Sequence, residues 1–368
     1  MRLLLAPSAF SPHRGGVEEL TLKLGQALQR RGHEVTVVTV RHPRSLPESD
    51  IVEGVPVLRL ALSAPGRHPR RMVEHLSTRG QAGRRLDALA RPDVVHLVCA
   101  SIQLPVVASY ARRVGAPLII TTQGETAMDA HGLYQRSQWM RGVLRRESSR
   151  AAALTACSRW TAEHAATIAP AFAVSDVVLN GVDPDDWSAV PEAPDEPIVV
   201  AWGRHVPQKG FDLLMAAFDL LREEVPHAQL VLGGDGPEHE RLQALAGPGV
   251  TLVGGLGRLG VRDLLAGARV VAVPSRIEPF GIVAVEALAA GRGLVWSTHG
   301  GLREASGGLG RGVDPFDAAA LATGLRDELA NPTKSEDGRA HAAGLSWDAL
   351  AARYESIYLH SLQERPPR

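Results

Sequence analysis

Residues 274–291 read PSRIEPFGIVAVEALAAG, and this stretch joins a strand end, a helix start and two glutamates. Pro279 fixes φ and lacks an N–H, so we predict that a helix begins just after Glu278, near residues 279–281. Glu286 lies within an apolar run, where a carboxylate is costly unless something pairs with it. In open α/β sheets, ligands bind at the carboxyl ends of the strands. Both glutamates are therefore predicted to lie at a ligand site.

Short apolar runs alternate with helical periodicity on both sides of this stretch, which favours parallel sheets covered by helices on both faces. In the first half, strands are predicted at 3–6, 35–40, 51–60 (an extended pair), 94–98, 118–122, 154–157 and 177–179, and helices at 17–32 and 67–89. In the second half, strands are predicted at 198–201, 229–232, 250–253, 270–273 and 293–297, and helices at 212–224, 237–246, 261–266 and 346–362.

The segment 184–197 is rich in proline and acidic residues and is predicted to be a linker. A chain of 368 residues exceeds what one core usually supports. We therefore predict two Rossmann-like domains at 1–183 and 198–345, followed by a terminal helix at 346–368. A bilobal α/β protein of this kind is expected to bind its ligand between the lobes.

Charge and cysteine content restrict the partners. The chain has 40 basic and 40 acidic side chains, so no global charge favours nucleic acid. Residues 1–180 hold 23 basic and 14 acidic side chains, which indicates either an anionic acceptor or membrane surface on that half, or merely different domain surfaces. Cys99 and Cys157 lack metal-ligand spacing, and no apolar run approaches a membrane span. A reduced, cytoplasmic chain, soluble or peripheral to a membrane, is expected.

Three glycine-containing loops follow predicted strands. Gly15 and Gly16 precede a helix, whose amino end favours an anion. Arg204 and Lys209 lie in the loop 203–210, and a guanidinium with an ammonium suits a diphosphate. The loop 233–238, GGDGPE, resembles a phosphate loop but lacks the dinucleotide fingerprint. Taken alone, these motifs are equally consistent with tight turns and solvated surface cations.

In chain order, the motifs GGVE, R-x4-K, GDGPE and E-PFG-x4-E resemble the family-4 retaining glycosyltransferases of the GT-B fold. NGVD at 180–183 and SW-x6-Y in the terminal helix are similar to the same family, so the resemblance covers nearly the whole chain. It implies two Rossmann-like domains that face a central cleft, and a C-terminal helix that crosses back to the first domain.

The resemblance also implies roles for individual residues. Arg204 and Lys209 would hold the donor diphosphate without a metal or other cofactor, Glu278 would bind a sugar hydroxyl, and Glu286 would bind the ribose. With Gln123 these residues form the catalytic set of Arg204, Lys209, Glu278 and Gln123. The donor-binding set is Gly15, Gly16, Gly203, Arg204, Lys209, Gly234, Leu256, Arg258, Glu278, Pro279, Phe280, Gly281, Ile282 and Glu286.

Two positions depart from the family pattern. Residues 122–125 read TQGE where many members have histidine before the glycine, and Gln123 can donate and accept hydrogen bonds but cannot titrate. A side chain that does not titrate argues against proton transfer by the residue at this position. Arg292 lies where the family commonly has proline, and it is expected to alter a loop rather than the chemistry.

Two further segments bear on the base of the donor nucleotide and on the acceptor substrate. The loop 254–262 contains Arg258 but no acid, and guanine would favour a carboxylate, so uracil or thymine is preferred over guanine. The segment 136–146 interleaves Arg136, Arg141, Arg145 and Arg146 with apolar residues. It indicates either contact with a membrane or an anionic acceptor, or an amphipathic helix with a solvated basic face.

We therefore predict a retaining glycosyltransferase that moves a sugar from a nucleoside diphosphate to a small-molecule or lipid-linked acceptor. A sugar-nucleotide epimerase with the same fold and a non-catalytic nucleotide-sugar-binding protein are alternatives. A dehydrogenase is disfavoured, because neither half has a dinucleotide loop after its first strand.

Overall fold

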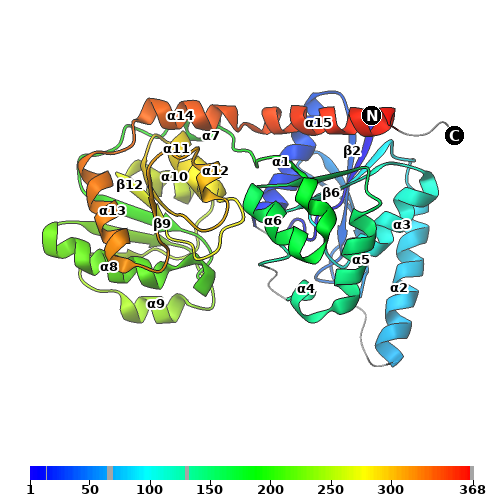
Figure 1. The fold of residues 1–368 in the computed structure, drawn as a ribbon, viewed down its shortest axis with the longest axis horizontal. Helices are drawn as coiled ribbons and strands as arrows, with labels where there is room; N and C mark the ends of the chain where they lie inside the picture. Colours follow the sequence, from blue (N-terminus) through cyan, green and yellow to red (C-terminus); the bar gives the residue numbers. More distant parts are fainter. Residues whose placement is uncertain (14, 64–68, 129–131, 365–368) are drawn as a thin grey trace. The chain divides into compact units, whose positions relative to one another are not determined.

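The computed structural model describes residues 1–13, 15–63, 69–128 and 132–364, and the chain divides into two compact units (Figure 1). Unit 1 comprises Met1–Val178 and Trp347–Arg368, and unit 2 comprises Leu179–Ser346. Each unit is a layered α/β structure with a mainly or wholly parallel sheet, which confirms the predicted fold class. The predicted linker, 184–197, falls within unit 2.

The sheet of unit 1 has the strand order β3-β4-β2-β1-β5-β6-β7-β8. All neighbouring strands are parallel except β3 and β4, which form the predicted extended pair. The strands are β1 (Arg2–Leu5), β2 (Glu34–Val40), β3 (Ser49–Val52), β4 (Val55–Leu60), β5 (Val94–Leu97), β6 (Leu118–Thr122), β7 (Ala153–Ala156) and β8 (Asp176–Val177).

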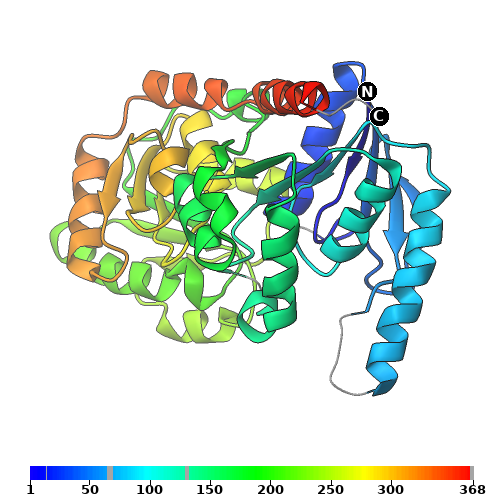
Figure 2. The same ribbon diagram turned by 45° about the vertical axis from the view of Figure 1, so that its right-hand side comes forward.

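Successive residues of a strand point to opposite faces of its sheet. Both faces of this sheet carry apolar residues, and helices cover both faces. Leu4 belongs to one buried cluster, with residues of α3 and α5, and Leu3 and Leu5 belong to another, with residues of α1 and α15. In Figure 2, the light-blue α2 lies beside α3. The helices are α1 (Gly16–Arg30), α2 (Pro69–Asp87), α3 (Leu104–Val114), α4 (Leu133–Arg136), α5 (Gln138–Ser148), α6 (Arg159–Ile168) and α15 (Trp347–Gln363), with a 3-10 turn η1 (Pro170–Val174).

The terminal helix α15 packs on α1 within unit 1, as predicted. Its apolar stripe is buried, and the stripe also carries hydroxyl groups into the core. Tyr358 Oη lies 2.7 Å from His96 Nδ1, and His96 Nε2 lies 2.6 Å from Thr121 Oγ1. Tyr354 Oη lies 3.3 Å from the same threonine oxygen. Burial lowers the pKa of His96 to about 3, so the ring is neutral and joins α15 to β5 and β6.

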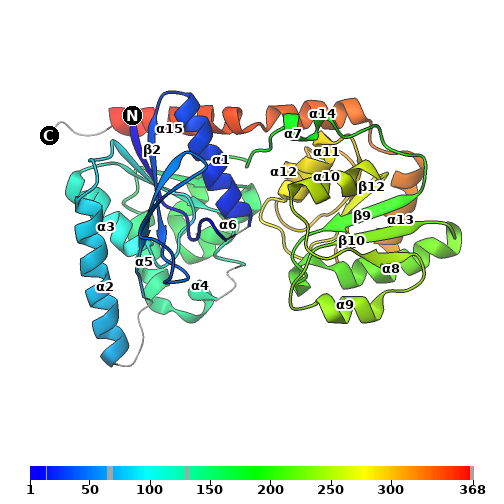
Figure 3. The same cartoon turned by 180° about the vertical axis from the view of Figure 1, so that it is seen from behind.

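The sheet of unit 2 has the order β11-β10-β9-β12-β13-β14, and all its strands are parallel. In Figure 3, β9 and β10 lie side by side with α8 and α9 nearby. The strands are β9 (Ile198–Trp202), β10 (Gln229–Gly233), β11 (Val250–Leu252), β12 (Val270–Val273), β13 (Gly293–Ser297) and β14 (Arg311–Val313). The helices are α7 (Asp185–Ser188), α8 (Phe211–Glu224), α9 (His239–Leu245), α10 (Arg258–Ala266), α11 (Ile282–Ala289), α12 (Leu302–Ala305), α13 (Ala318–Ala330) and α14 (Ser335–Gly344), with a 3-10 turn η2 (Pro207–Lys209).

The buried bond of Tyr358 gives a test of how α15 is held. Tyr358→Phe should lower the free energy of unfolding by about 1–3 kcal/mol, because it leaves a ring nitrogen of His96 buried without its partner. Urea unfolding measures this loss. Leu359→Ala is the control, since Leu359 is 47% exposed on the same helix and its change should stay within about 0.5 kcal/mol. Wild-type stability of the phenylalanine variant would contradict the role of the bond.

Candidate active site

The second sheet has a topological switch point at its first strand. β9 is flanked by β10 on one side and β12 on the other, because the chain runs outward from β9 through β10 to β11 and then crosses back to β12. Ligands of open α/β sheets bind outside the carboxyl ends of the strands at such a point. Arg204 and Lys209 follow β9, and Glu278 follows β12. The topology therefore brings together three residues that the sequence predicts to bind the donor.

Lys209 and Glu278 form a direct ion pair at this edge. The ammonium Nζ lies 2.5 Å from Glu278 Oε2, and Ser275 Oγ donates a hydrogen bond of 3.1 Å to the same oxygen. The Lys209 side chain is 21% exposed and the Glu278 side chain 11%, so the pair is shielded from solvent more than a surface pair. Each side chain therefore fixes the position of the other.

The loop that carries Lys209 is also fixed by the loop after β12. Gly210 has φ +68°, and a Cβ at this position would collide with the carbonyl oxygen of Pro274. The N–H of Arg276 donates to Gln208 O at 2.8 Å, and its guanidinium binds both carboxylate oxygens of Asp212 at 2.8 and 3.1 Å. Burial acts to raise the pKa of Asp212, but the hydrogen bond and charge of Arg276 outweigh it and lower the pKa.

Arg204 differs from Lys209 in its surroundings. Its side chain is exposed and forms no ion pair with any residue in the described part of the chain. An arginine without a carboxylate partner offers all its N–H donors to an external anion. The loop thus presents one free guanidinium and one ammonium held by Glu278.

The loop 233–238 packs tightly against the Arg204 loop. A Cβ at Gly234, where φ is +129°, would collide with the carbonyl oxygen of Gly203. His205 N donates to Asp235 O at 2.8 Å, and Gly234 N donates to Gly254 O at 2.5 Å. The predicted donor-site glycines Gly203 and Gly234 therefore have a local role in the close approach of two loops, whatever they bind.

His205 is not among the predicted site residues, although it lies inside the Arg204 loop. It is fully buried and stacks on His239 with the ring planes 9° apart, and the two Nδ1 atoms are 3.1 Å apart. Burial lowers the pKa of His205, so the neutral ring supports the loop. Only the position of His205 within the motif could have indicated this role.

The helix α11 begins at Ile282, in agreement with the predicted start just after Glu278. Gly281 precedes it with φ +100°, Phe280 is buried, and Ile282 is half-buried. Glu286 is also half-buried, which is less than the surrounding apolar sequence suggests. Pro279 precedes the buried Phe280 in the bend that leads into α11.

The loop 299–301 also supports the site, although it is not among the predicted site residues. Gly301 N donates to Glu278 O at 2.8 Å, and a Cβ at Gly300, where φ is +98°, would collide with the same oxygen. Its sequence, HGG after a buried strand, is the signal that could have identified it. Glu278 is thus held through its backbone as well as its side chain.

The predicted base loop has acidic neighbours that its own sequence does not reveal. Leu256 lies over Gly233, where an added Cβ would contact its Cδ1 at 2.5 Å. Arg258 Nη1 lies 2.8 Å from Asp186 Oδ2, and its guanidinium lies 5.5 Å from the centre of the Trp187 ring. Asp235 lies beside Gly255. Arg258 is therefore bound to α7, and two carboxylates lie near the loop.

In unit 1, the predicted glycines Gly15 and Gly16 lie at the start of α1, with Gly15 as its N-cap. A Cβ at Gly15 would lie 2.6 Å from the carboxylate oxygen Oε2 of Glu18, so an acidic side chain turns back over this helix end. Gln123 directly follows β6 at the carboxyl edge of the first sheet. These residues belong to unit 1, separately from the donor loops of unit 2.

The basic segment 136–146 is less available than its sequence suggests. Arg141 Nη2 donates to Gln135 O at 2.8 Å, and Arg145 Nε donates to Ile168 O at 2.7 Å. Arg146 forms an ion pair of 2.8 Å with the buried Glu147. Trp139 remains 41% exposed. Within the described residues, no helix is long and apolar enough to cross a membrane.

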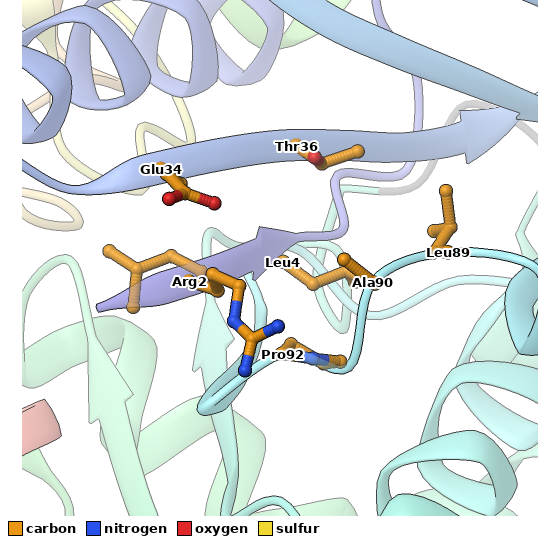
Figure 4. A pocket seen from close by; sticks show the side chains of 8 residues that line it. Arg2, Leu4, Glu34, Thr36, Leu89, Ala90 and Pro92 are labelled. Atoms are coloured by element: carbon orange, nitrogen blue, oxygen red, sulfur yellow. The ribbon is translucent and has the colours of Figure 1, made fainter.

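A small cavity lies at the amino ends of β1, β2 and β5, away from these loops (Figure 4). It is lined by Arg2, Leu4, Glu34, Thr36 and Pro92, among others, and its volume is about 60 Å³. Ligand pockets for small molecules are on the order of 300–1,000 Å³. The cavity therefore has room for water but not for a nucleotide sugar.

Among the described residues, no group of three or more histidine, cysteine, aspartate or glutamate side chains is placed to hold a metal ion. The loop after β9 carries the cations Arg204 and Lys209, and the loop after β12 carries Arg276, which is paired with Asp212. The donor set at this edge is therefore suited to an anionic ligand.

Comparisons with known proteins identify the family of the chain. The family described as Glycosyltransferase Family 4 matches residues 14–186, and Glycosyl transferases group 1 matches residues 196–331. Glycogen synthase of Mycobacterium tuberculosis is 29% identical, over 100% of this chain and 97% of the relative. A GDP-mannose-dependent alpha-(1-6)-phosphatidylinositol monomannoside mannosyltransferase of the same species is 30% identical, over 96% of each chain. Sucrose-phosphate synthase from Thermosynechococcus elongatus superposes with a TM-score of 0.75 at 23% identity, over 97% of this chain and 98% of that one.

The fold and the matched families define a class of α/β glycosyltransferases with the GT-B fold. The chain belongs to glycosyltransferase family 4 and is a glycosyltransferase.

Gly210 gives a test of the geometry of the lysine loop. Gly210→Ala should lower the free energy of unfolding by about 1–3 kcal/mol, because its backbone is left-handed and the new methyl group collides with Pro274 O. Thermal unfolding measures the effect. Gly344→Ala in α14 is the control, since a Cβ there meets open space and should be neutral or stabilising. Equal unfolding temperatures for both variants would contradict the packing described here.

Proposed function

We propose that this glycosyltransferase moves a sugar from a nucleoside diphosphate to an acceptor hydroxyl with retention of the anomeric configuration. The ion pair between Lys209 and Glu278 beside the free guanidinium of Arg204 carries the proposal. Arg204 and Lys209 bind the diphosphate, and Glu278 accepts a hydrogen bond from the sugar. Because Glu278 already holds Lys209, one carboxylate orients both the sugar and the cation that stabilises its leaving group.

The proposed reaction depends on electrostatic stabilisation of the departing diphosphate. Fixed cations at the position where negative charge develops stabilise the transition state more than mobile cations do, because they need not reorganise during the reaction. We assign no covalent nucleophile. The acceptor attacks the face that the diphosphate leaves, the bond from the anomeric carbon to the phosphate oxygen breaks, and the leaving phosphate takes the acceptor's proton. The chemistry requires no metal in this proposal.

Two candidates remain for the base. Uracil or thymine follows from the absence of an acid in 254–262, and Arg258 neutralises the neighbouring Asp186. Guanine is the second candidate, supported by Asp235 beside Gly255 and by the GDP-mannose dependence in the printed name of the mannosyltransferase relative. We retain uracil or thymine as the proposal, because the loop 254–262 itself carries no acid and the neighbouring Asp186 is bound to Arg258.

The acceptor is proposed to be a small molecule or a lipid-linked sugar or polyol. The printed name of the mannosyltransferase relative includes a phosphatidylinositol glycolipid, which supports a lipid-linked acceptor and contact with the inner face of a membrane. The exposed Trp139 supports the same contact, whereas the internal bonds of Arg141, Arg145 and Arg146 leave less free charge for it.

The two cations give a direct test. Arg204→Ala should lower kcat about 10²–10³-fold with little change in unfolding temperature, because Arg204 is exposed and has no ion-pair partner among the described residues. Lys209→Ala should lower kcat similarly and also destabilise the loop around Glu278. Nucleotide release from UDP-glucose and GDP-mannose is the assay. Arg326→Ala, which removes exposed ion pairs with Glu224 and Asp327, is the control. Wild-type turnover in both cation variants would exclude the proposal.

The base is tested by calorimetric titration with UDP, dTDP and GDP. We expect UDP or dTDP to bind about tenfold or more tightly than GDP, since guanine would leave donor groups unpaired. Tighter binding of GDP would reverse the assignment. In that case Asp235→Asn should weaken GDP and leave UDP unchanged if this carboxylate reads guanine.

A further inference from the structure

Glu125, the last residue of the TQGE sequence, joins two loops at the carboxyl edge of the first sheet. Its Oε2 accepts the backbone N–H of Gln123 at 2.7 Å, and its Oε1 accepts the backbone N–H of Ala100 at 3.1 Å. Thr122 Oγ1 lies 3.4 Å from Oε2. Ala100 follows β5 and Gln123 follows β6, so one carboxylate connects the ends of two neighbouring strands.

Glu125 is desolvated, and a desolvated carboxylate needs hydrogen-bond donors. Burial raises the pKa of Glu125, while the N–H groups of Gln123 and Ala100 and the thiol of Cys99 act against this shift. Burial and the nearby Glu125 both raise the pKa of Cys99, so Cys99 remains a thiol that can donate a hydrogen bond. An ionised carboxylate has about four acceptor sites. In Glu125 the N–H groups of Gln123 and Ala100, the Thr122 hydroxyl and the Cys99 thiol surround the two oxygens, so few acceptor sites remain for a substrate.

The loop after β6 is also supported on either side of Gln123, because Cys157 N donates to Thr122 O at 3.2 Å and Gln135 Nε2 donates to Thr126 O at 2.9 Å. Gly124 follows with φ +96°, and its carbonyl accepts the N–H groups of Ala127 and Met128 at 3.0 and 2.8 Å. These bonds close the turn on itself, whereas the bonds of Glu125 tie it to β5. The Glu125 carboxylate therefore links the backbone N–H of Gln123 to the end of β5.

We propose that Glu125 is a positioning residue for glycosyl transfer, which acts by fixing Gln123 through the paired bonds to Gln123 N and Ala100 N. This inference rests on the proposed function and on the predicted place of Gln123 in the catalytic set. Its saturated acceptor sites distinguish Glu125 from a catalytic base. Displacing a reacting group or its support by about 1 Å costs on the order of 10²-fold in rate, so the arrangement is expected to affect kcat.

A double-mutant cycle tests the inference with Gln123→Ala, Glu125→Gln and the double variant. Glutamine keeps one acceptor oxygen and replaces the other with an NH2 group, which cannot accept a backbone N–H. Glu125→Gln should lower kcat about 10–100-fold for nucleotide release from UDP-glucose or GDP-mannose, with a much smaller change in donor KM. The double variant should be no slower than Gln123→Ala alone, because Glu125 acts through Gln123.

Glu328→Gln is a matched control. Glu328 is a buried carboxylate of unit 2 that accepts the N–H of Leu294 at 3.1 Å and the N–H of Thr333 at 2.6 Å, together with a threonine hydroxyl, at the amino end of β13. Its substitution should lower stability but not kcat. A loss of kcat in this control as large as in Glu125→Gln would assign the effect to general destabilisation and overturn the inference. Multiplicative losses in the double variant, or wild-type kcat in Glu125→Gln, would also overturn it.

Backbone hydrogen exchange gives a second readout that does not need turnover. Glu125→Gln should speed exchange at Gln123 and Ala100, and the control should speed it at Leu294 and Thr333 instead. Unchanged exchange at Gln123 would overturn the positioning role of Glu125, even if no nucleotide sugar is hydrolysed. Wild-type kcat in Gln123→Ala would refute the proposed role of Gln123, whereas an absence of nucleotide release from the wild type would refute the proposed function. These two outcomes are therefore distinguishable from a failure of the positioning role of Glu125.

Discussion

The close approach of four loops at the carboxyl edge of the second sheet is the constraint on which the proposed donor site depends. Carbonyl oxygens of Gly203, Pro274 and Glu278 occupy the space where side chains of Gly234, Gly210 and Gly300 would begin. Because these positions lack a Cβ and have positive φ, the backbone can bring the loops together without collision. The ion pair of Lys209 and Glu278 is a consequence of this packing. Its two partners are 69 residues apart and would not otherwise be held at one point.

A different constraint organises the first sheet, where polar groups are buried and must be satisfied within the protein. His96 lies on a strand whose neighbours Val95 and Leu97 face the opposite core cluster, so alternation directs its ring toward α15. The helix supplies the hydroxyls of Tyr354 and Tyr358 from its apolar stripe. A buried imidazole without partners would cost about 1–3 kcal/mol. The polar contacts therefore specify how the C-terminal segment is seated on unit 1, beyond what apolar burial alone determines.

Much of the fold could be predicted because the signals are local. The start of α11, the extended pair of β3 and β4 and the buried stripe of α15 follow from spacing within a few residues. The strand β14 and the helices α12 to α14 have weak patterns, since β14 is three residues long and these helices are rich in alanine and glycine. The partners of Arg258 could not be predicted. Asp186 and Trp187 lie about 70 residues earlier in the predicted linker, and periodicity contains no information on such pairings.

Arg292 shows how a departure from a family pattern can be read only with its surroundings known. The sequence predicts that it alters a loop, and the side chain is in fact buried, with Nε donating to Leu265 O at 2.8 Å and Nη2 donating to Pro191 O. Burial, with the charge of Arg339, lowers its pKa to about 10, so it remains charged at neutral pH. An internal cation that binds carbonyl groups joins α10, the strand entry at β13 and the segment before β9. The same desolvation argument that first drew attention to Glu286 thus applies more strongly to Arg292, Glu278 and Glu328, because these groups are buried whereas Glu286 is only half-buried. Sequence patterns identify a charged residue among apolar neighbours, but the three-dimensional packing decides which of these charged side chains is buried from solvent.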